Sequence, residues 1–469
     1  MTSIPASTVF MSQAIILVGL GFGDEGKGSI TDFLCRKHNA HLVCRFNGGA
    51  QAGHNVVTSD GKHHTFSQFS SGTLAGAETY LSRYMIVNPL LLQYEEEHLV
   101  TLGVTDAYQR LTIDEGALVT TPFHMAMNRL REMHREAFLT CKKIGKGRHG
   151  SCGMGIGETV SDSIQDPDGS IRMRDFRKQS VVKDKLEAIR HKKMVEAIHL
   201  LDDLPVELSG EMTKKIMSEY GLLEDKTLID YCMDQYYNLI DNVGVRVVDQ
   251  DYLLGALESG TTIFEGAQGV LLDEEYGFHP HSTWSNCTFH NALELLKGFS
   301  GKVTRMGVTR TYLTRHGAGP FPSEDPDARL VEHNTKGEWQ GAFRVGFYDF
   351  VLARYAREIL GGMDEVALNH LDHICGPQKV CLRYDCSTKP FYKLLLDANT
   401  WEAYQHLKKY FDKDGIPYSH FLDIYAEPVF TTLNDPDRLI SGISKTMRAP
   451  ITILSHGSTS DDKELTCRR

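Results

Sequence analysis

Short apolar runs alternate with glycine-rich loops and helix-type segments along this chain of 469 residues. Residues 14–20 (AIILVGL) are continuously apolar, as is typical of a strand buried on both faces of a parallel sheet. The glycine-rich segment 21–28 follows directly, and apolar residues then recur at helical spacing at Ile30, Phe33 and Leu34. The pattern predicts a strand, a loop and a helix in succession.

Further strand-type runs are spread over the chain. A second strand is predicted at residues 41–46, followed by the glycine-rich GGAQAGHN and by a hairpin whose turn is Asp60-Gly61. Glycine, polar residues or histidine follow the later runs, and loops after parallel strands are where α/β sheets bind ligands. These later runs are residues 261–265, 302–308, 365–371 and 449–454.

Residues from about 125 to 240 are dominated by helix-type sequence, such as MAMNRLREMHREAF and DKLEAIRHKKMVEAIHLLDDL. We expect a helical insertion there. Because no repeat, linker or compositional break divides the chain, we predict an N-terminal extension (1–13) and a single α/β domain (14–469). Its core would be a P-loop-like, mainly parallel sheet flanked by helices.

Composition narrows the class of function. The chain has 50 lysines and arginines against 61 acidic residues, a net charge of -11, which disfavours a protein that binds mainly to nucleic-acid backbones. Its ten cysteines include no Cys-x-x-Cys pair, a pattern typical of reduced thiols in the cytoplasm. The first apolar run is too short to span a bilayer. We therefore expect a cytoplasmic protein that acts on small molecules, without nucleic-acid or membrane partners.

The loop GFGDEGKG fits the G-x-x-x-x-G-K part of a phosphate-binding loop. Its glycines, including Gly23, Gly26 and Gly28, allow backbone N–H groups to face phosphate oxygens, and Lys27 adds a mobile cation. Asp24 brings a carboxylate toward the same phosphates, which is costly unless a metal ion or a proton-transfer role balances it. The alternative, a turn with an incidental surface acid, fits the flanking strand and helix less well.

Five segments together resemble the adenylosuccinate synthetase family, in order and at suitable separations. They are GDEGKG, GGAQAGHNVV, FEGAQGVLLD, TRHGAGPFPSE and NHLDH, and the resemblance covers most of the chain from about Ala14 to Leu465. It implies a single α/β domain that commonly forms homodimers. It also implies a ligase of purine nucleotide biosynthesis, which joins aspartate to the 6-position of IMP through a 6-phosphoryl intermediate, with GTP and Mg²⁺.

The resemblance also implies roles for single residues. Asp24 matches the base that takes the proton from purine N1 and also binds the metal ion, and His54 matches the acid that acts on the transferred phosphate. Gly53 would give a backbone carbonyl to the metal ion, Lys27 would neutralise phosphate charge, and Gln268 would contact the 6-oxygen. The other residues implied for phosphate or GTP are Gly23, Glu25, Gly26, Gly28, Asp372, Ser455 and Gly457.

The substrate side departs from the family pattern. Residues Ser151–Met154 stand where the family has Thr-Thr-Gly-Arg, so a hydroxyl becomes a thiol and an arginine is lost. The family has a run of arginines that holds aspartate and the ribose. In the corresponding residues 341–344 of this chain, only Arg344 is an arginine. Thr283 still matches a threonine that contacts the substrate phosphate. The substrate contacts implied for this chain are Gln51, Cys152, Gln268, Thr283 and Arg344.

These departures leave alternatives to IMP and aspartate open. One keeps the chemistry and uses another 6-oxopurine (deoxy)nucleotide, such as GMP or dGMP, another amine donor, or ATP. The lost arginine suits a deoxynucleotide, whereas the phage relatives that use dGMP tend to lose the loop aspartate that Asp24 retains. Sequence drift, with Arg148 or Arg310 replacing the lost arginine, explains the departures equally well. A catalytically inactive nucleotide-binding regulator is the third alternative, although a mere binder needs no base.

Overall fold

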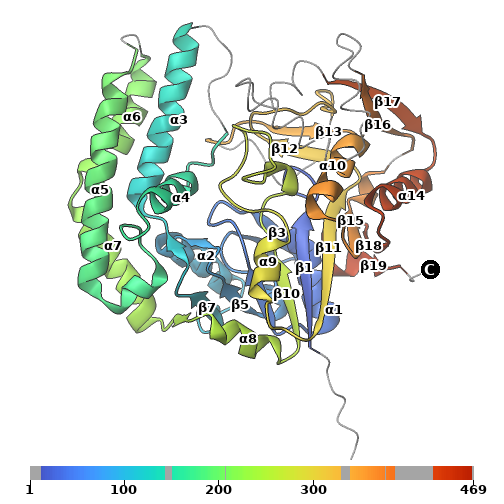
Figure 1. The fold of residues 1–469 in the computed structure, drawn as a ribbon, viewed down its shortest axis with the longest axis horizontal. Helices are drawn as coiled ribbons and strands as arrows, with labels where there is room; N and C mark the ends of the chain where they lie inside the picture. The colour runs from blue at the N-terminus through green and yellow to red at the C-terminus, as the bar shows by residue number, and fades with distance from the viewer. Residues whose placement is uncertain are drawn as a thin grey trace, which may run out of the picture.

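The computed structural model describes residues 12–142, 150–205, 208–328, 338–374, 376–385 and 426–466. At its centre lies a ten-stranded sheet in the order β19-β18-β15-β11-β1-β10-β2-β5-β7-β9, parallel except for the pairing of β18 with β19 (Figure 1). The predicted α/β fold with a mainly parallel sheet is confirmed. The strands are β1 (Gln13–Gly19), β2 (Leu42–Arg45), β5 (Glu78–Leu81), β7 (Leu111–Asp114), β9 (Arg246–Val248), β10 (Thr261–Glu265), β11 (Lys302–Arg310), β15 (Glu365–Asn369), β18 (Ile451–Ser455) and β19 (Lys463–Leu465).

Strand β1 is covered on both faces. Its alternate residues enter two different hydrophobic cores, with Ala14, Ile16 and Val18 in one and Ile15 and Leu17 in the other. Strands β10 and β11 pair with it in parallel on its two edges. Because polar side chains would be buried on either face, only a continuous apolar run suits this position.

The six strands predicted from apolar runs are β1, β2, β10, β11, β15 and β18, and they are the six consecutive strands at the centre of the sheet. The four that sequence reasoning missed lie toward its edges. Those four are three or four residues long and mix apolar with polar residues, so they give no continuous apolar run. The predicted hairpin is also observed, as β3 (His54–Val57) paired antiparallel with β4 (His63–Phe66), with Gly61 left-handed in the turn (φ 86°).

The helical content predicted for residues 125–240 is observed. The helices α3 (Pro122–Lys142), α4 (Ile156–Gln165), α5 (Gln179–Asp202), α6 (Gly210–Glu224) and α7 (Thr227–Tyr237) stand together beside the sheet in Figure 1. The apolar faces of α3, α5, α6 and α7 share one core with strands β5 and β7. This packing suits the predicted single domain, which stays a prediction together with the N-terminal extension, since residues 1–11 lie outside the described part of the chain.

The remaining elements surround the sheet. No helix among the described residues is both long and apolar enough to cross a membrane. A strand pair, β12 (Leu313–His316) with β13 (Phe343–Gly346), and a small sheet of β14 (Tyr348–Asp349), β16 (Gln378–Asp385) and β17 (Glu427–Leu433) lie outside the central sheet. Strand β6 (Ile86–Val87) pairs with β8 (Leu118–Val119). The other α-helices described are α1 (Lys27–His38), α2 (Pro89–Thr101), α8 (Asp251–Leu257), α9 (His290–Leu295), α10 (Phe350–Leu360) and α14 (Pro436–Met447).

Candidate active site

Two cavities share a wall near the carboxyl end of β10. Cavity A, of about 660 Å³, is lined by the loop between β1 and α1, by the start of β3 and by the residues that follow β15 and β18. Cavity B, of about 530 Å³, is lined by α3, by residues 150–152 and 280–284, and by the start of α4. A ligand in one cavity can therefore meet a ligand in the other at the shared wall. Residues lining both cavities are Gln51, Gln268, Leu272, His316 and Gln340.

The loop between β1 and α1 is built around the carboxylate of Glu25. This carboxylate accepts hydrogen bonds from the backbone N–H groups of Gly21 (3.0 Å) and Gly23 (2.8 Å) and lies 2.6 Å from Nζ of Lys27. Glu25 lines neither cavity and would repel phosphate, so its predicted phosphate contact is corrected to a supporting role inside the loop. Gly269 is confined by the same group, because a Cβ there would lie 2.5 Å from Oε1 of Glu25.

The rest of the loop contributes directly to cavity A. Gly23, Gly26 and Lys27 line it, as predicted for phosphate binding. Gly28 is not among the residues that line the cavity, so its phosphate contact stays a prediction, and the structure shows a packing role for it. A Cβ at Gly28 would lie 2.9 Å from Cβ of His54, so glycine here allows β3 to approach the first turn of α1.

Asp24 extends the loop into cavity A. Its backbone is left-handed (φ 61°), and its Oδ2 lies 3.3 Å from Nε2 of His316 at the end of β12. The Asp24 side chain is 18% exposed, so it can exchange protons with a ligand. Its carboxylate and the backbone carbonyl of Gly53, which also lines cavity A, are hard oxygen donors of the kind that Mg²⁺ prefers.

His54 lines cavity A at the start of β3. Its Nδ1 lies 2.7 Å from Oε1 of Glu265, the last residue of β10. Burial lowers the pKa of His54, so the neutral ring donates Nδ1–H to Glu265 and keeps Nε2 for a ligand. Burial alone would raise the pKa of Glu265, but His54, Arg45 and a hydrogen bond from Ser71 act against burial and hold this pKa at about 2.

The shared wall carries two amide side chains. Both amide atoms of Gln51 and Oε1 of Gln268 are buried without a hydrogen-bond partner in the described part of the chain. Leaving such atoms unpaired is costly. The two amides therefore suit a planar ligand that offers both donors and acceptors. The substrate contacts predicted for Gln51 and Gln268 would be made at this wall between the two cavities.

The far end of cavity A is polar and aromatic. Asp372, Ser455 and Gly457 line it, in the positions predicted for a nucleotide base. The ring of Tyr312 lies 5.5 Å from the ring of His370, and the 3-10 turn Leu371–His373 presents Asp372 beside these rings. A carboxylate next to aromatic rings suits a heterocycle that carries N–H donors.

Cavity B contains two further predicted substrate residues, Cys152 and Thr283. Arg344 is different, because it lines neither cavity A nor cavity B. Its Nε lies 2.9 Å from Oε1 of Glu324 and its Nη2 binds Oε2, while Nη1 donates to the carbonyls of Gly317 and Gly319. Its predicted role as a clamp for substrate is therefore corrected, since this guanidinium already holds the loop between β12 and β13.

The sequence profile described as adenylosuccinate synthetase matches residues 16–463. The chain belongs to the adenylosuccinate synthetase family. Adenylosuccinate synthetase of Clostridium botulinum (strain Alaska E43 / Type E3) is 31% identical over 381 residues, which cover 79% of this chain and 81% of the relative. The Thermobifida fusca (strain YX) protein of the same name is 30% identical over 383 residues, with the same coverage. The structure of fully ligated adenylosuccinate synthetase from Plasmodium falciparum has a TM-score of 0.68 at 21% identity and covers 97% of this chain and 99% of that one, which supports the fold.

Membership of the adenylosuccinate synthetase family confirms the prediction of a ligase that forms a carbon–nitrogen bond in purine biosynthesis. Enzymes of this family act on a purine nucleotide and aspartate and generally use GTP and Mg²⁺. The structure adds site residues that sequence reasoning did not single out. His316 and Glu265 lie inside the motifs TRHGAGPFPSE and FEGAQG, which was the available signal. Arg131 and Arg135 of α3 also line cavity B, and no motif marks them beyond their helical spacing.

The alkylation rate of Cys152 tests the environment of its thiol in cavity B. Burial raises the pKa of its thiol to about 11, so at pH 8 the thiolate is about 100-fold scarcer than at an ordinary pKa of 9. We expect iodoacetamide to alkylate Cys152 about 100-fold more slowly than free cysteine at pH 8, as measured by peptide mass spectrometry. The rate should rise steeply between pH 9 and 11. Alkylation at the rate of free cysteine would contradict the raised pKa of this thiol.

Proposed function

We propose that this chain is a GTP- and Mg²⁺-dependent ligase that joins aspartate to the 6-position of IMP and forms adenylosuccinate. The observation that carries the proposal is that Asp24, His54 and Lys27 line cavity A, whose wall of Gln51 and Gln268 also lines cavity B. A triphosphate in cavity A and a 6-oxopurine in cavity B would bring the γ-phosphate and O6 together at this wall. Family membership supports the same reaction.

The first step would phosphorylate the purine. Asp24 takes the proton from N1 while O6 attacks the γ-phosphorus, and the bond to the β–γ bridging oxygen breaks to release GDP. An approaching phosphate favours protonation of His54 at Nε2, so that this residue then donates a hydrogen bond to the group in transfer. Lys27 and the loop N–H groups stabilise the accumulating negative charge. In the second step the amine of aspartate attacks C6, loses a proton, and phosphate leaves.

The site also fits a magnesium ion. Asp24 and Gly53 both line cavity A, and the Asp24 carboxylate and the Gly53 carbonyl would hold the ion through oxygen ligands. When bound there, Mg²⁺ neutralises charge on the phosphates. This chain's own residues account for proton removal and for positioning the purine.

A second candidate function keeps the chemistry and changes a substrate: GMP or dGMP as the acceptor, another amine donor, or ATP in place of GTP. It is favoured by the lack of an arginine in Ser151–Gly157 and by the pairing of Arg344 with Glu324. The inactive regulator is disfavoured because Asp24 and His54 line the same cavity. A homodimer and a cytoplasmic location stay predictions.

A panel of substrates tests the proposal. Purified protein with Mg²⁺ is offered GTP or ATP, then IMP, GMP or dGMP, and then a set of amino acids that includes aspartate. We expect phosphate release only with GTP, IMP and aspartate together, and a product with the mass of adenylosuccinate. Release with another matching set would establish the second candidate. GTP binding without substrate-dependent release would overturn both and support the regulator.

A further inference from the structure

The glycine-rich loop that lines cavity B carries no cation. Its residues Ser151–Gly157 provide hydroxyl, thiol, thioether and aliphatic side chains, and the raised pKa of Cys152 keeps its thiol neutral at pH 7. Hydroxyl and backbone N–H groups can orient an anion, but they do not neutralise its charge. An anionic ligand in cavity B therefore needs cations from another element.

Helix α3 presents two such cations. Arg131 and Arg135 are four residues apart on one face of the helix, and both line cavity B with side chains 33% exposed. Arg131 donates from Nε to Glu158 (2.8 Å) and from Nη2 to Glu196 (2.7 Å), and Arg135 donates from Nη1 to Glu132 (2.6 Å). In the part of the chain that the structure describes, Nη1 of Arg131 and Nε and Nη2 of Arg135 donate to no protein atom. These donors are free to bind an anion.

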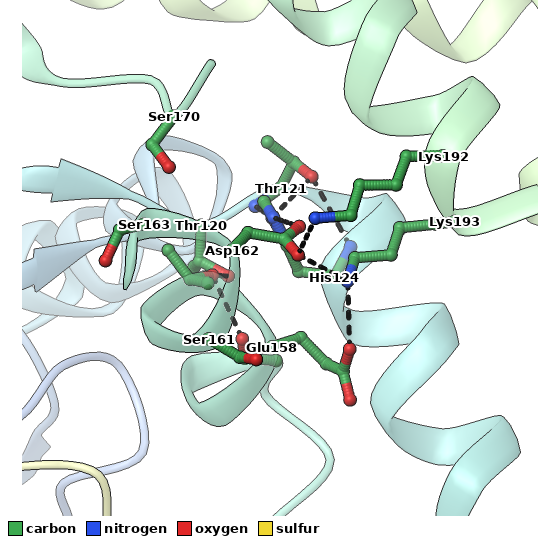
Figure 2. A network of polar contacts seen from close by, with 12 residues as sticks. Thr120, Thr121, His124, Glu158, Ser161, Asp162, Ser163, Ser170, Lys192 and Lys193 are labelled. Carbon is green, nitrogen blue, oxygen red and sulfur yellow. Dashed lines mark hydrogen bonds and ion pairs between the residues drawn. The ribbon is translucent and has the colours of Figure 1, made fainter. Parts of the chain in front are cut away.

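The carboxylates near Arg131 also have other cationic partners. Figure 2 shows Lys193 of α5 reaching Glu158 and Asp162 of α4, with Nζ 3.0 and 2.9 Å from their oxygens. Lys193 is 1% exposed, and Lys192 adds a contact of 2.7 Å to Asp162. Lys192 and Lys193 therefore offset part of the negative charge of these carboxylates, and Arg131 is not their only cationic partner. The same network holds Glu158, which in turn orients the guanidinium of Arg131.

We propose that Arg131 and Arg135 bind the phosphate group of the acceptor nucleotide and thereby select a nucleoside monophosphate in cavity B. This inference rests on the proposed function, since it places the acceptor there. Thr283 lines the same cavity and adds a hydroxyl donor, so two cations and a hydroxyl line one cavity, as a phosphate with several acceptor oxygens requires. A carboxylate of the amine donor has the same anionic chemistry but fewer oxygens, and the test separates the two sources.

The test compares Arg131→Gln, Arg135→Gln and the double variant with the wild type. We expect the KM for the acceptor nucleotide to rise 10- to 100-fold in each single variant, the loss typical of a charged hydrogen bond, with little change in kcat or in the KM for GTP and the amine donor. The matched control is Arg177→Gln, which removes a 67% exposed arginine that lines neither cavity. Arg135→Lys should restore part of the affinity.

Measurements with the nucleoside, which is the acceptor without its phosphate, distinguish phosphate binding from a structural effect of the substitutions. If the arginines bind the phosphate, the kcat/KM of the nucleotide falls in the variants while that of its nucleoside is unchanged, whereas local damage lowers both. A rise confined to the KM of the amine donor would overturn the phosphate assignment, and so would an unchanged KM for the nucleotide. If the wild type releases no phosphate with any substrate set, the proposed function fails, and calorimetric titration with IMP still tests the arginines. Equal affinity for IMP in the wild type and the double variant would overturn the phosphate-binding role of the two arginines, independently of the proposed function.

Discussion

Asp24→Asn is expected to lower the rate of phosphate release by about 10²- to 10⁴-fold, the usual contribution of a positioned general base. The amide cannot accept the proton from purine N1, and it is a poorer ligand for Mg²⁺ than a carboxylate. Binding of GTP should stay near the wild-type level, because Lys27 and the loop N–H groups are unchanged. The measurements are kcat for phosphate release and the Kd of GTP from a fluorescence titration.

The loop should fold normally in this variant. Asp24 has a left-handed backbone (φ 61°), a conformation that asparagine adopts at least as readily as aspartate. Its side chain is partly exposed, so no buried charge is left unpaired. The matched control is Asp184→Asn, at an exposed position on α5, which should retain full activity. Near-normal turnover in Asp24→Asn would refute the mechanism proposed for cavity A.

Glu265→Gln is expected to reduce both stability and activity. The carboxylate lies 3.9 Å from Nε of Arg45, whose side chain is fully buried, and 2.7 Å from Nδ1 of His54. Neutralising one partner leaves the charge of Arg45 uncompensated, which costs about 3–5 kcal/mol. The glutamine also orients His54 less firmly, so kcat should fall. Urea unfolding and phosphate release measure the two effects.

The stability loss should depend on pH in a defined direction. The pKa of Glu265 is lowered from 4.5 to about 2, so its carboxylate contributes about 3 kcal/mol above pH 4.5, and this contribution disappears as the pH falls through about 2. The difference in stability between wild type and Glu265→Gln should therefore be constant from pH 5 to 7 and shrink below pH 4.5.

Two further variants control this result. Glu258→Gln changes an exposed carboxylate next to α8 and should leave stability unchanged. Adding Arg45→Met to Glu265→Gln removes the uncompensated cation and should recover part of the lost stability. A Glu265→Gln protein as stable as the wild type at pH 7 would show that the buried pair is not a significant source of stability.

The central strands and the phosphate loop could be predicted because their signals are local. The apolar run and the GDEGKG loop that follows it involve only residues that are neighbours in sequence. The structure shows β1, the loop and α1 arranged as expected. The motifs likewise placed Asp24, His54 and Gln268 at one site, and all three line cavity A. Strands β5, β7, β9 and β19 were missed because these short strands mix apolar with polar residues and give no continuous apolar run.

The roles of charged residues depended on contacts distant in sequence. Arg344 was expected to bind substrate, but Glu324 and two backbone carbonyls occupy it. Glu25 was expected to bind phosphate, but its carboxylate turns inward to the loop N–H groups and Lys27. In both cases the sequence shows the charge but not the partner that compensates it.

The fold class, the family and the candidate reacting groups of cavity A could be inferred from the sequence, because short-range patterns encode strands, turns and the loop that carries Asp24. Which cations face cavity B depends instead on contacts between residues distant in sequence. Arg131 and Arg135 come from α3, more than a hundred residues after the phosphate loop, and their orientation depends on Glu158 and on Lys193 of α5. Whether a charge is free for a ligand depends on which opposite charges folding brings beside it, and no local pattern in the chain records that arrangement.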